Sequence, residues 1–279
     1  MRNLALTSVL PLLLLMAPAQ AQTPLPIIKV RHLTLNGLTG ISQVDQQQIA
    51  RDIKKQTYTD STINGIPDRL RSALVQRGFL GAYAPAPDII VVSSKSGEEV
   101  IDMTYQVQAG SRYRLKQISF TSNQPQFAFP ERDLRQSFAI SDGAAFDSEA
   151  IRTGLQKLRQ LYATRGYVNC TPMPDIEPDD TSATVSVKID VDEGAVYRVG
   201  VLVLDGVEPV QGAGAKLLES WKQYQGQVAN PKLAADFMRA NAAYLTPKAV
   251  ILPFSEDGSQ HLLNFRLSFD GPSASNQSD

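Results

Sequence analysis

Three segments of the chain alternate between apolar and polar residues, which is the pattern of a β-strand with one buried and one solvated face. The odd-numbered positions of residues 101–107, 185–191 and 263–269 are all apolar, and the even-numbered positions between them are all polar. Each segment is followed by a glycine, at Gly110, Gly194 and Gly271. Three such strands, each with its own glycine, predict a repeated unit rather than one large domain.

A helical phrase also occurs twice. Residues 69–79 and 157–167 both begin with a basic residue and a leucine and end with Arg-Gly-aromatic, 88 positions apart. Ahead of the second copy, Asp147 suits a helix N-cap. The helix that follows carries one apolar stripe, formed by Ile151, Leu155, Leu158 and Tyr162. Gly166 can adopt the left-handed conformation that ends a helix, and we expect the next aromatic residue to pack back over that end.

These patterns predict the order strand, helix, helix, strand, strand in three successive copies. The fold class is therefore α+β, with three small mixed sheets, each covered on one face by two helices. The first strands are expected at residues 27–35, 115–120 and 199–204. The strands that follow the second helix are expected at residues 88–92, 168–173 and 249–254.

The expected domains are residues 22–110, 111–194 and 195–271, preceded by a signal peptide at 1–21 and followed by a polar tail at 272–279. The third copy is degenerate. Leu245-Thr246-Pro247 stands where the other copies have glycine and an aromatic residue, so only its element order and its alternation support it.

The first 21 residues predict export. Arg2 precedes an apolar run at residues 4–16, and Ala19-Gln20-Ala21 is a small-x-small cleavage site. An uncleaved anchor is the alternative, but the run is shorter than the roughly 18 to 20 apolar residues of a spanning helix. Because Cys170 is the only cysteine, no internal disulfide is possible, and the periplasm is the expected compartment.

The charge balance argues against a nucleic-acid partner. The chain carries 27 Lys plus Arg and 28 Asp plus Glu, for a net charge of −1. Nucleic-acid binding requires a concentrated basic surface that displaces counterions from phosphates. The hydrophobic content of 43% is that of an ordinary soluble globular protein.

Residues that carry chemistry are few. His32 and His261 lie far apart without a metal-ligand spacing, and we interpret both as strand or surface histidines. Cys170 has no histidine nearby in sequence and is expected to be a half-buried structural thiol. For the four carboxylates of residues 174–180, a solvated hairpin connection is favoured over weak Ca²⁺ binding. Helical spacing places Trp221 in the core. No cofactor, metal ion or catalytic residue is predicted.

The combination of elements resembles POTRA domains, whose second helix ends on glycine and an aromatic residue. The strand that ends at Asp192-Glu193-Gly194, followed by Tyr197-Arg198-Val199, is similar to the junction between consecutive POTRA domains of BamA-like outer-membrane assembly factors. The resemblance covers residues 24–271 and is most specific in the middle copy. It implies a periplasmic, non-enzymatic interaction module. The membrane β-barrel of those factors is not expected here, because a polar tail follows residue 271.

In POTRA domains the last strand is central, so the resemblance implies that the strand after the second helix is an edge. An edge strand can accept an extended segment by β-augmentation. The candidate partner-binding residues are Ile89, Ile90, Val91, Val92, Val168, Asn169, Thr171, Val250 and Ile251. Pro172, Pro174 and Pro253 remove backbone donors, so a blunted edge is an equal alternative in the second copy. In the first copy, whose residues 89–92 contain no proline, binding is favoured.

The expected partners are an outer-membrane β-barrel protein or its assembly complex, and unfolded client segments. Membrane association is expected only through a partner. Two other classes of function stay open. A structural adaptor of a cell-envelope or division complex would link domains without handling clients. An exported hydrolase would have to rely on carboxylates, since the chain has only two histidines and one cysteine.

Overall fold

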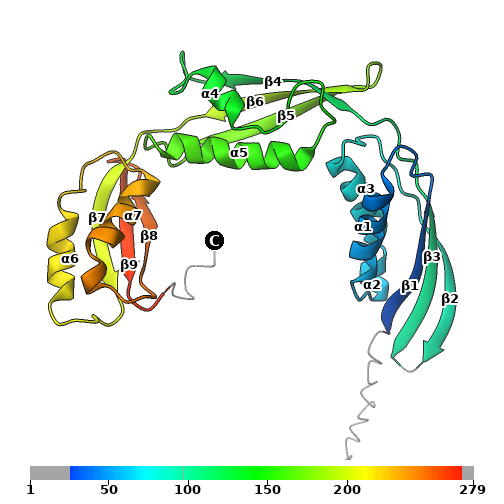
Figure 1. Cartoon of the computed structure of the whole chain (residues 1–279), viewed down its shortest axis with the longest axis horizontal. Helices are drawn as coiled ribbons and strands as arrows, with labels where there is room; N and C mark the ends of the chain where they lie inside the picture. Colours follow the sequence, from blue (N-terminus) through cyan, green and yellow to red (C-terminus); the bar gives the residue numbers. More distant parts are fainter. Residues whose placement is uncertain (1–25, 96, 272–279) are drawn as a thin grey trace, which may run out of the picture. The chain divides into compact units, whose positions relative to one another are not determined.

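The computed structural model describes residues 26–95 and 97–271, so the expected signal peptide and polar tail lie outside the described residues. The described chain forms three sheets of three strands, with the orders β1-β3-β2, β4-β6-β5 and β7-β9-β8 (Figure 1). In each sheet the last strand is central, parallel to the first strand and antiparallel to the second. The predicted α+β class with three small mixed sheets is confirmed.

The first sheet contains β1 (Ile27–Asn36), β2 (Asp88–Lys95) and β3 (Glu98–Gln106). Between β1 and β2 lie α1 (Gln43–Lys54), the single turn α2 (Asp60–Ile63) and α3 (Ile66–Gln76). Ser42 caps α1, because its side chain accepts a hydrogen bond from the N–H of Asp45 at 3.1 Å. The sequence prediction does not include α2, since a single turn is too short to show an apolar period.

The second sheet contains β4 (Arg114–Ser122), β5 (Thr171–Asp179) and β6 (Thr184–Asp192). Its helices are α4 (Glu131–Gln136) and α5 (Ser148–Ala163), and α5 runs along one face of the sheet (Figure 1). The predicted stripe of α5 is buried and packs in one core with the odd-numbered residues of β6. These β6 side chains have no exposed surface.

The third sheet contains β7 (Arg198–Asp205), β8 (Val250–Asp257) and β9 (Leu262–Ser268). Its helices are α6 (Ala213–Trp221) and α7 (Pro231–Ala240), followed by the short 3-10 turn η1 (Ala242–Tyr244). Trp221 is a core residue, as predicted. Its ring meets that of Phe237 edge to face at 4.8 Å, and its indole N–H donates to the carbonyl oxygen of Gly200 at 3.0 Å.

Two predicted elements around β5 are wrong. The strand expected at 168–173 begins at Thr171, and most of the expected acidic loop at 174–180 belongs to the same strand. The later start of β5 has a local cause. Gly166, at φ +85°, ends the helix, and the chain then makes a further turn in which the N–H of Cys170 bonds the carbonyl of Tyr167 at 3.3 Å. An exposed edge strand rich in proline and carboxylates has the composition of a loop, so the pattern did not distinguish them.

The contacts between residues divide the chain into two compact units. One contains β1, α1, α2, β2 and β3, and the other contains residues 37–41 and 70–84 together with the second and third sheets. The expected domain boundaries after Gly110 and Gly194 stay a prediction.

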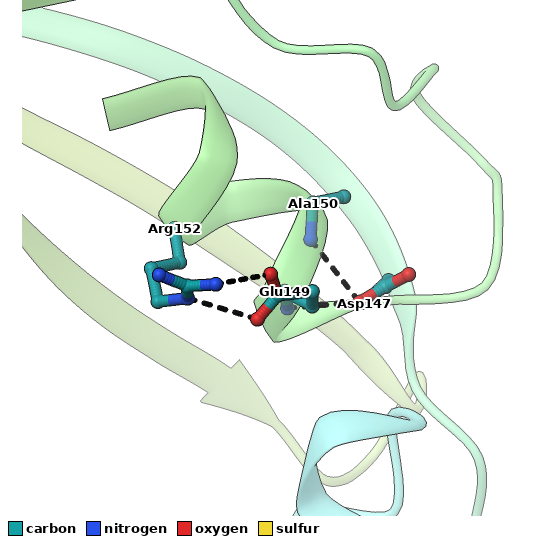
Figure 2. A network of polar contacts seen from close by, with 4 residues as sticks. All are labelled: Asp147, Glu149, Ala150 and Arg152. Carbon is teal, nitrogen blue, oxygen red and sulfur yellow. Dashed lines mark hydrogen bonds and ion pairs between the residues drawn. The ribbon is translucent and has the colours of Figure 1, made fainter. Parts of the chain in front are cut away.

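The N-terminus of α5 is held by a side-chain cap. Asp147 accepts hydrogen bonds from the backbone N–H groups of Glu149 at 2.8 Å and Ala150 at 3.1 Å, as predicted from sequence (Figure 2). Glu149 in turn forms a two-pronged ion pair with Arg152, one turn along the helix (Figure 2). Arg152 holds the pKa of the Glu149 carboxyl below its usual range, chiefly through these hydrogen bonds. Both side chains of the pair are more than half exposed, so the pair adds little stability.

We expect Asp147→Ala to lower the free energy of unfolding by about 1 kcal/mol, because two N–H groups at the start of α5 lose their acceptor. Glu149→Gln is the matched control. It removes only the exposed ion pair and should change stability by less than about 0.5 kcal/mol. Urea denaturation followed by circular dichroism measures both. Equal losses in the two variants would contradict the importance of the cap.

Candidate protein-interaction surface

The edge strand β2 exposes a run of four apolar side chains, from Ile89 to Val92, each between 40% and 67% exposed. The ladder places Ile89 opposite Met103 and Val91 opposite Ile101. Since Met103 and Ile101 are buried, Ile89 and Val91 lie on the core side of the sheet, and Ile90 lies on the other side. Apolar groups are therefore accessible on both faces of this edge.

The direction of the backbone groups decides whether an edge can accept a strand. The N–H and C=O groups of one residue point to the same side of a strand, and those of the next residue point to the other side. The three bonds that fix the direction here run from Ile27 N–H to Gly97 O, from Arg114 N–H to Ala183 O and from Phe269 N–H to Asp205 O, each at 3.0 Å. In all three sheets, the odd-numbered residues of the central strand therefore point their backbone N–H and C=O groups toward the parallel strand. Some residues of β2, β5 and β8 pair with these odd-numbered residues. Their own N–H and C=O groups point outward, in the plane of the sheet, past its open edge.

The outward-pointing positions differ among the three edges. In β2 they are Ile89, Val91 and Ser94, all of which have an N–H group. In β8 they are Ile251, Pro253 and Glu256, and Pro253 has no N–H group. In β5 they are Pro172, Pro174, Ile176 and Pro178, of which three lack it. Because proline cannot donate, β5 is blunted along nearly its whole length, whereas β2 presents a complete set of donors.

The remaining candidate residues have other positions. Thr171 and Val250 lie opposite Asp192 and Ser268, so their backbone groups point into their own sheets. Val168 and Asn169 precede β5 and lie against the third sheet. Val168 packs on its core, and the side-chain amide of Asn169 donates to Tyr197 at 3.2 Å and to Glu256 at 2.7 Å. These two residues join one sheet to the next and are not part of an edge.

The two Gly-aromatic helix ends form matching joints with the chain that follows each sheet. The carbonyl of Gly166 accepts from the N–H of Tyr197 at 2.8 Å, and the carbonyl of Tyr197 accepts from the N–H of Ala229 at 2.9 Å. In the earlier joint Gly78, Tyr113 and Phe146 make the same two bonds, both at 2.9 Å. Each tyrosine therefore bridges the end of one helix and the segment that leads into a later one.

The arginine after each tyrosine has a matching role. Arg114 donates to the carbonyl of Gly143 at 2.9 Å, and Arg198 donates to the carbonyl of Gly226 at 2.8 Å. The repeated Tyr-Arg pair is thus explained by backbone acceptors. The sequence showed that the phrase repeats but not what it contacts.

The role of Glu193 was not predicted from the sequence. This carboxylate follows β6 and is only 3% exposed. It accepts hydrogen bonds from the Tyr162 hydroxyl at 2.7 Å and from the N–H of Ala128 at 2.9 Å. Burial, assisted by the bond to Glu193, raises the pKa of Tyr162, so its hydroxyl stays a donor. The Asp192-Glu193-Gly194 motif was the available signal.

Residues considered for chemistry are held in structural positions. Cys170 is buried rather than half-buried, and burial raises the pKa of its thiol to about 12, so it is not a thiolate at neutral pH. The backbone N–H of His32 donates to Asp102 at 3.2 Å, and the ring of His261 lies 5.6 Å from that of Tyr197. Within residues 26–95 and 97–271, no group of three or more His, Cys, Asp or Glu side chains could hold a metal ion.

A cavity of about 440 Å³ lies between α7 and β8 and is lined mainly by apolar side chains, including Val168, Ala234, Pro253 and Phe265. Glu256 and Asn230 supply its polar atoms. It adjoins the edge of the third sheet, where Pro253 interrupts the row of outward-pointing N–H groups.

In the part of the chain that the structure describes, no helix is long and apolar enough to cross a membrane.

Comparison with known proteins agrees with this geometry. The POTRA family model, described as a surface antigen variable number repeat, matches residues 113–194. The outer membrane protein assembly factor BamA of Neisseria meningitidis serogroup B is 20% identical over 204 residues, covering 67% of this chain and 25% of that protein. BamA of Buchnera aphidicola is 21% identical over 182 residues, covering 65% of this chain and 28% of that protein. The chain therefore spans about a quarter of the length of these relatives.

Among solved structures, the crystal structure of POTRA domains 3 to 5 of Haemophilus influenzae BamA matches with a TM-score of 0.60 and 16% identity. The match covers 90% of this chain and 100% of the other. This likeness concerns the fold. The family match shows a POTRA domain at residues 113–194, and the chain as a whole resembles the POTRA region of BamA in its fold.

The backbone directions predict a pattern of amide hydrogen exchange in β2. The N–H of Ile90, opposite Asp102, points into the sheet, whereas those of Ile89 and Val91 point outward. We expect Ile90 to exchange at least about tenfold more slowly than both neighbours, which corresponds to roughly 1.4 kcal/mol of protection. Exchange into D₂O followed by NMR measures the three rates. Slower exchange at Ile89 and Val91 would reverse the assignment of the open edge.

The joints predict a strong effect of Gly166→Ala. A Cβ atom there would lie 2.8 Å from Val228 and 2.9 Å from the carbonyl oxygen of Tyr197, at φ +85°. We expect a loss of about 2 to 5 kcal/mol, from backbone strain plus overpacking. Gly143→Ala is the control, because Gly143 has φ +80° but open space around its Cβ position, and it should cost only about 1 to 2 kcal/mol. Equal losses in urea denaturation would mean that the contacts across the joint do not matter.

Proposed function

We propose that this chain is a non-enzymatic protein-interaction scaffold that acts from the periplasm in outer-membrane protein assembly or secretion. The POTRA match to residues 113–194 and the likeness to the POTRA region of BamA support the scaffold role. The relatives that are named as outer membrane protein assembly factors support the process. The expected partners are an outer-membrane β-barrel protein or its assembly complex, and unfolded client segments.

We further propose that β2 binds an extended client segment as a fourth strand of the first sheet. The observation that carries this proposal is the outward-pointing backbone of Ile89, Val91 and Ser94, with apolar side chains exposed beside it. Backbone hydrogen bonds would supply affinity without reading the client's sequence. Such indifference suits a protein that handles many clients.

The side chains of β2 set a preference among clients. Ile89 and Val91 flank the core side of the edge, so a client strand gains most from apolar residues at alternate positions on that side. On the other face the client would meet Ile90. An amphipathic strand, apolar on every second residue, satisfies the core side and is the pattern of a membrane β-barrel strand.

A structural envelope adaptor without client handling is the second candidate. The observation that favours it is β5, whose three outward-pointing prolines leave the second sheet without an open edge on that side. An adaptor would use the sheets as rigid spacers. It would show no binding of extended peptides at β2.

The test compares Ile89→Pro with Ile89→Thr in the full mature chain. Proline removes the outward N–H while leaving the bonds between β2 and β3 in place, as the prolines of β5 do. Threonine keeps the N–H and removes only apolar surface. For a ten-residue peptide that alternates valine and threonine, we expect Ile89→Pro to weaken binding at least about tenfold and Ile89→Thr to weaken it less, by calorimetry.

Melting temperatures of both variants must match the unchanged protein for this comparison to apply, and Ile90→Thr provides a third variant with an intact outward backbone. Equal weakening by the proline and threonine variants would mean that side chains, not backbone bonds, hold the client. Absence of peptide binding by the unchanged chain would favour the adaptor.

A further inference from the structure

The outer faces of the three sheets, on the side away from the helices, differ in one row of residues. In the second sheet Lys188 lies between Ser119 and Asp175, and in the first sheet the corresponding Thr104 lies between Thr34 and Asp88. These rows are polar, as expected for a solvated face. In the third sheet the corresponding residue is Arg266, and it lies between Val203 and Leu252.

Apolar side chains therefore surround a cation on the outer face of the third sheet. Val201, Val203 and Leu252 are each between 39% and 51% exposed. The guanidinium of Arg266 lies over the ring of Phe254, with its carbon 4.9 Å from the ring centroid. We call these five residues the Arg266 patch. Its side chains come from all three strands of one sheet.

The backbone beneath the patch is fixed by a built-in bulge. The ladder between β7 and β9 shifts register between Val199 and Leu202. The side-chain oxygen of Asn264 accepts a hydrogen bond from the N–H of Val201 at 3.0 Å and occupies space that a Cβ on Gly200 would need. Such a bulge re-aims the side chains next to it, here Val201. The exposed apolar surface is thus held in place by specific contacts.

Arg266 forms no ion pair with any residue that the structure describes. Among the residues described, no carboxylate lies within ion-pair distance of its guanidinium. On the outer face of the first sheet, by contrast, Arg31 pairs with Asp102 at 2.5 Å. A guanidinium that lies over an aromatic ring can still donate hydrogen bonds from its N–H groups to a ligand.

We propose that the Arg266 patch is a docking surface for a different protein, which presents a carboxylate surrounded by apolar side chains. Apolar contacts with Val201, Val203 and Leu252 exclude water around the guanidinium, and the carboxylate pairs with it through two parallel N–H···O bonds. Charge complementarity selects this partner over two others. A second copy of the chain, paired face to face, would bring two Arg266 side chains toward one axis with no carboxylate in either patch. A membrane surface is recognised by clusters of about 4–8 Lys or Arg, and the patch has one.

The docking surface is distinct from the edge of β2 and does not depend on client binding there. The experiment places the photo-crosslinking residue benzoylphenylalanine at position 252 of the full chain, in the cells that make it. Asp175 is the matched control position, because it occupies the same place beside Lys188 that Leu252 occupies beside Arg266. We expect one discrete adduct with another protein from position 252 and none from position 175.

Charge dependence identifies the contact. Arg266→Glu should reduce the adduct at least fivefold (roughly 1 kcal/mol), while Arg266→Lys should reduce it less. Mass spectrometry of the adduct should place an Asp or Glu in the crosslinked segment of the partner. Replacing that residue with Arg should restore the adduct to the Arg266→Glu chain. Circular dichroism and the melting temperature of each variant confirm that the third sheet is folded.

Several results would overturn the proposal. These are an adduct unaffected by Arg266→Glu, an adduct with a second copy of the chain or within the chain itself, and equal crosslinking from positions 175 and 252. Arg266-dependent binding of the purified chain to vesicles of phosphatidylglycerol and phosphatidylcholine, without a protein adduct in cells, would assign the patch to a membrane instead.

Discussion

The alternation of apolar and polar residues in the three central strands determines how each sheet pairs and which face its helices cover. The odd-numbered apolar residues of β3, β6 and β9 put their side chains into the core and their backbone groups toward the parallel strand. The helices must then cover that face, and the even-numbered residues must bond the antiparallel edge. The outward positions of each edge follow from the same parity. Prolines at 172, 174 and 178 are tolerated because all three fall on positions whose N–H would otherwise point to solvent.

The two joints are also formed by backbone bonds. A glycine carbonyl at the end of a helix and a tyrosine N–H at the start of the next strand make the same contact twice, at Gly78 with Tyr113 and at Gly166 with Tyr197. The Gly-aromatic phrase therefore both ends a helix and provides an acceptor for the following segment. The phrase is absent at residues 245–247.

The elements that have a clear local pattern in the sequence were predicted correctly. The central strands, the buried stripe of α5 and the cap at Asp147 all follow from local patterns, and the structure agrees with them. The start of β5 could not be predicted, because the turn after Gly166 has no periodic signal and the strand is rich in proline and acid. For the candidate site, the pattern identified the apolar run at residues 89–92 but not which amides point outward, since that depends on pairing with β3. The pattern predicts an edge position for Val168 and Asn169, because their contacts with the third sheet are not visible in the sequence.

Interchain nuclear Overhauser effects between a bound, isotope-labelled client peptide and β2 would show directly whether the client adds to the first sheet. If the client adds as a fourth strand, its amide and α protons should lie next to the amide protons of Ile89 and Val91, in the alternating pattern of a β-ladder. Contacts confined to other segments, or to side chains of β2 without its backbone amides, would contradict the account.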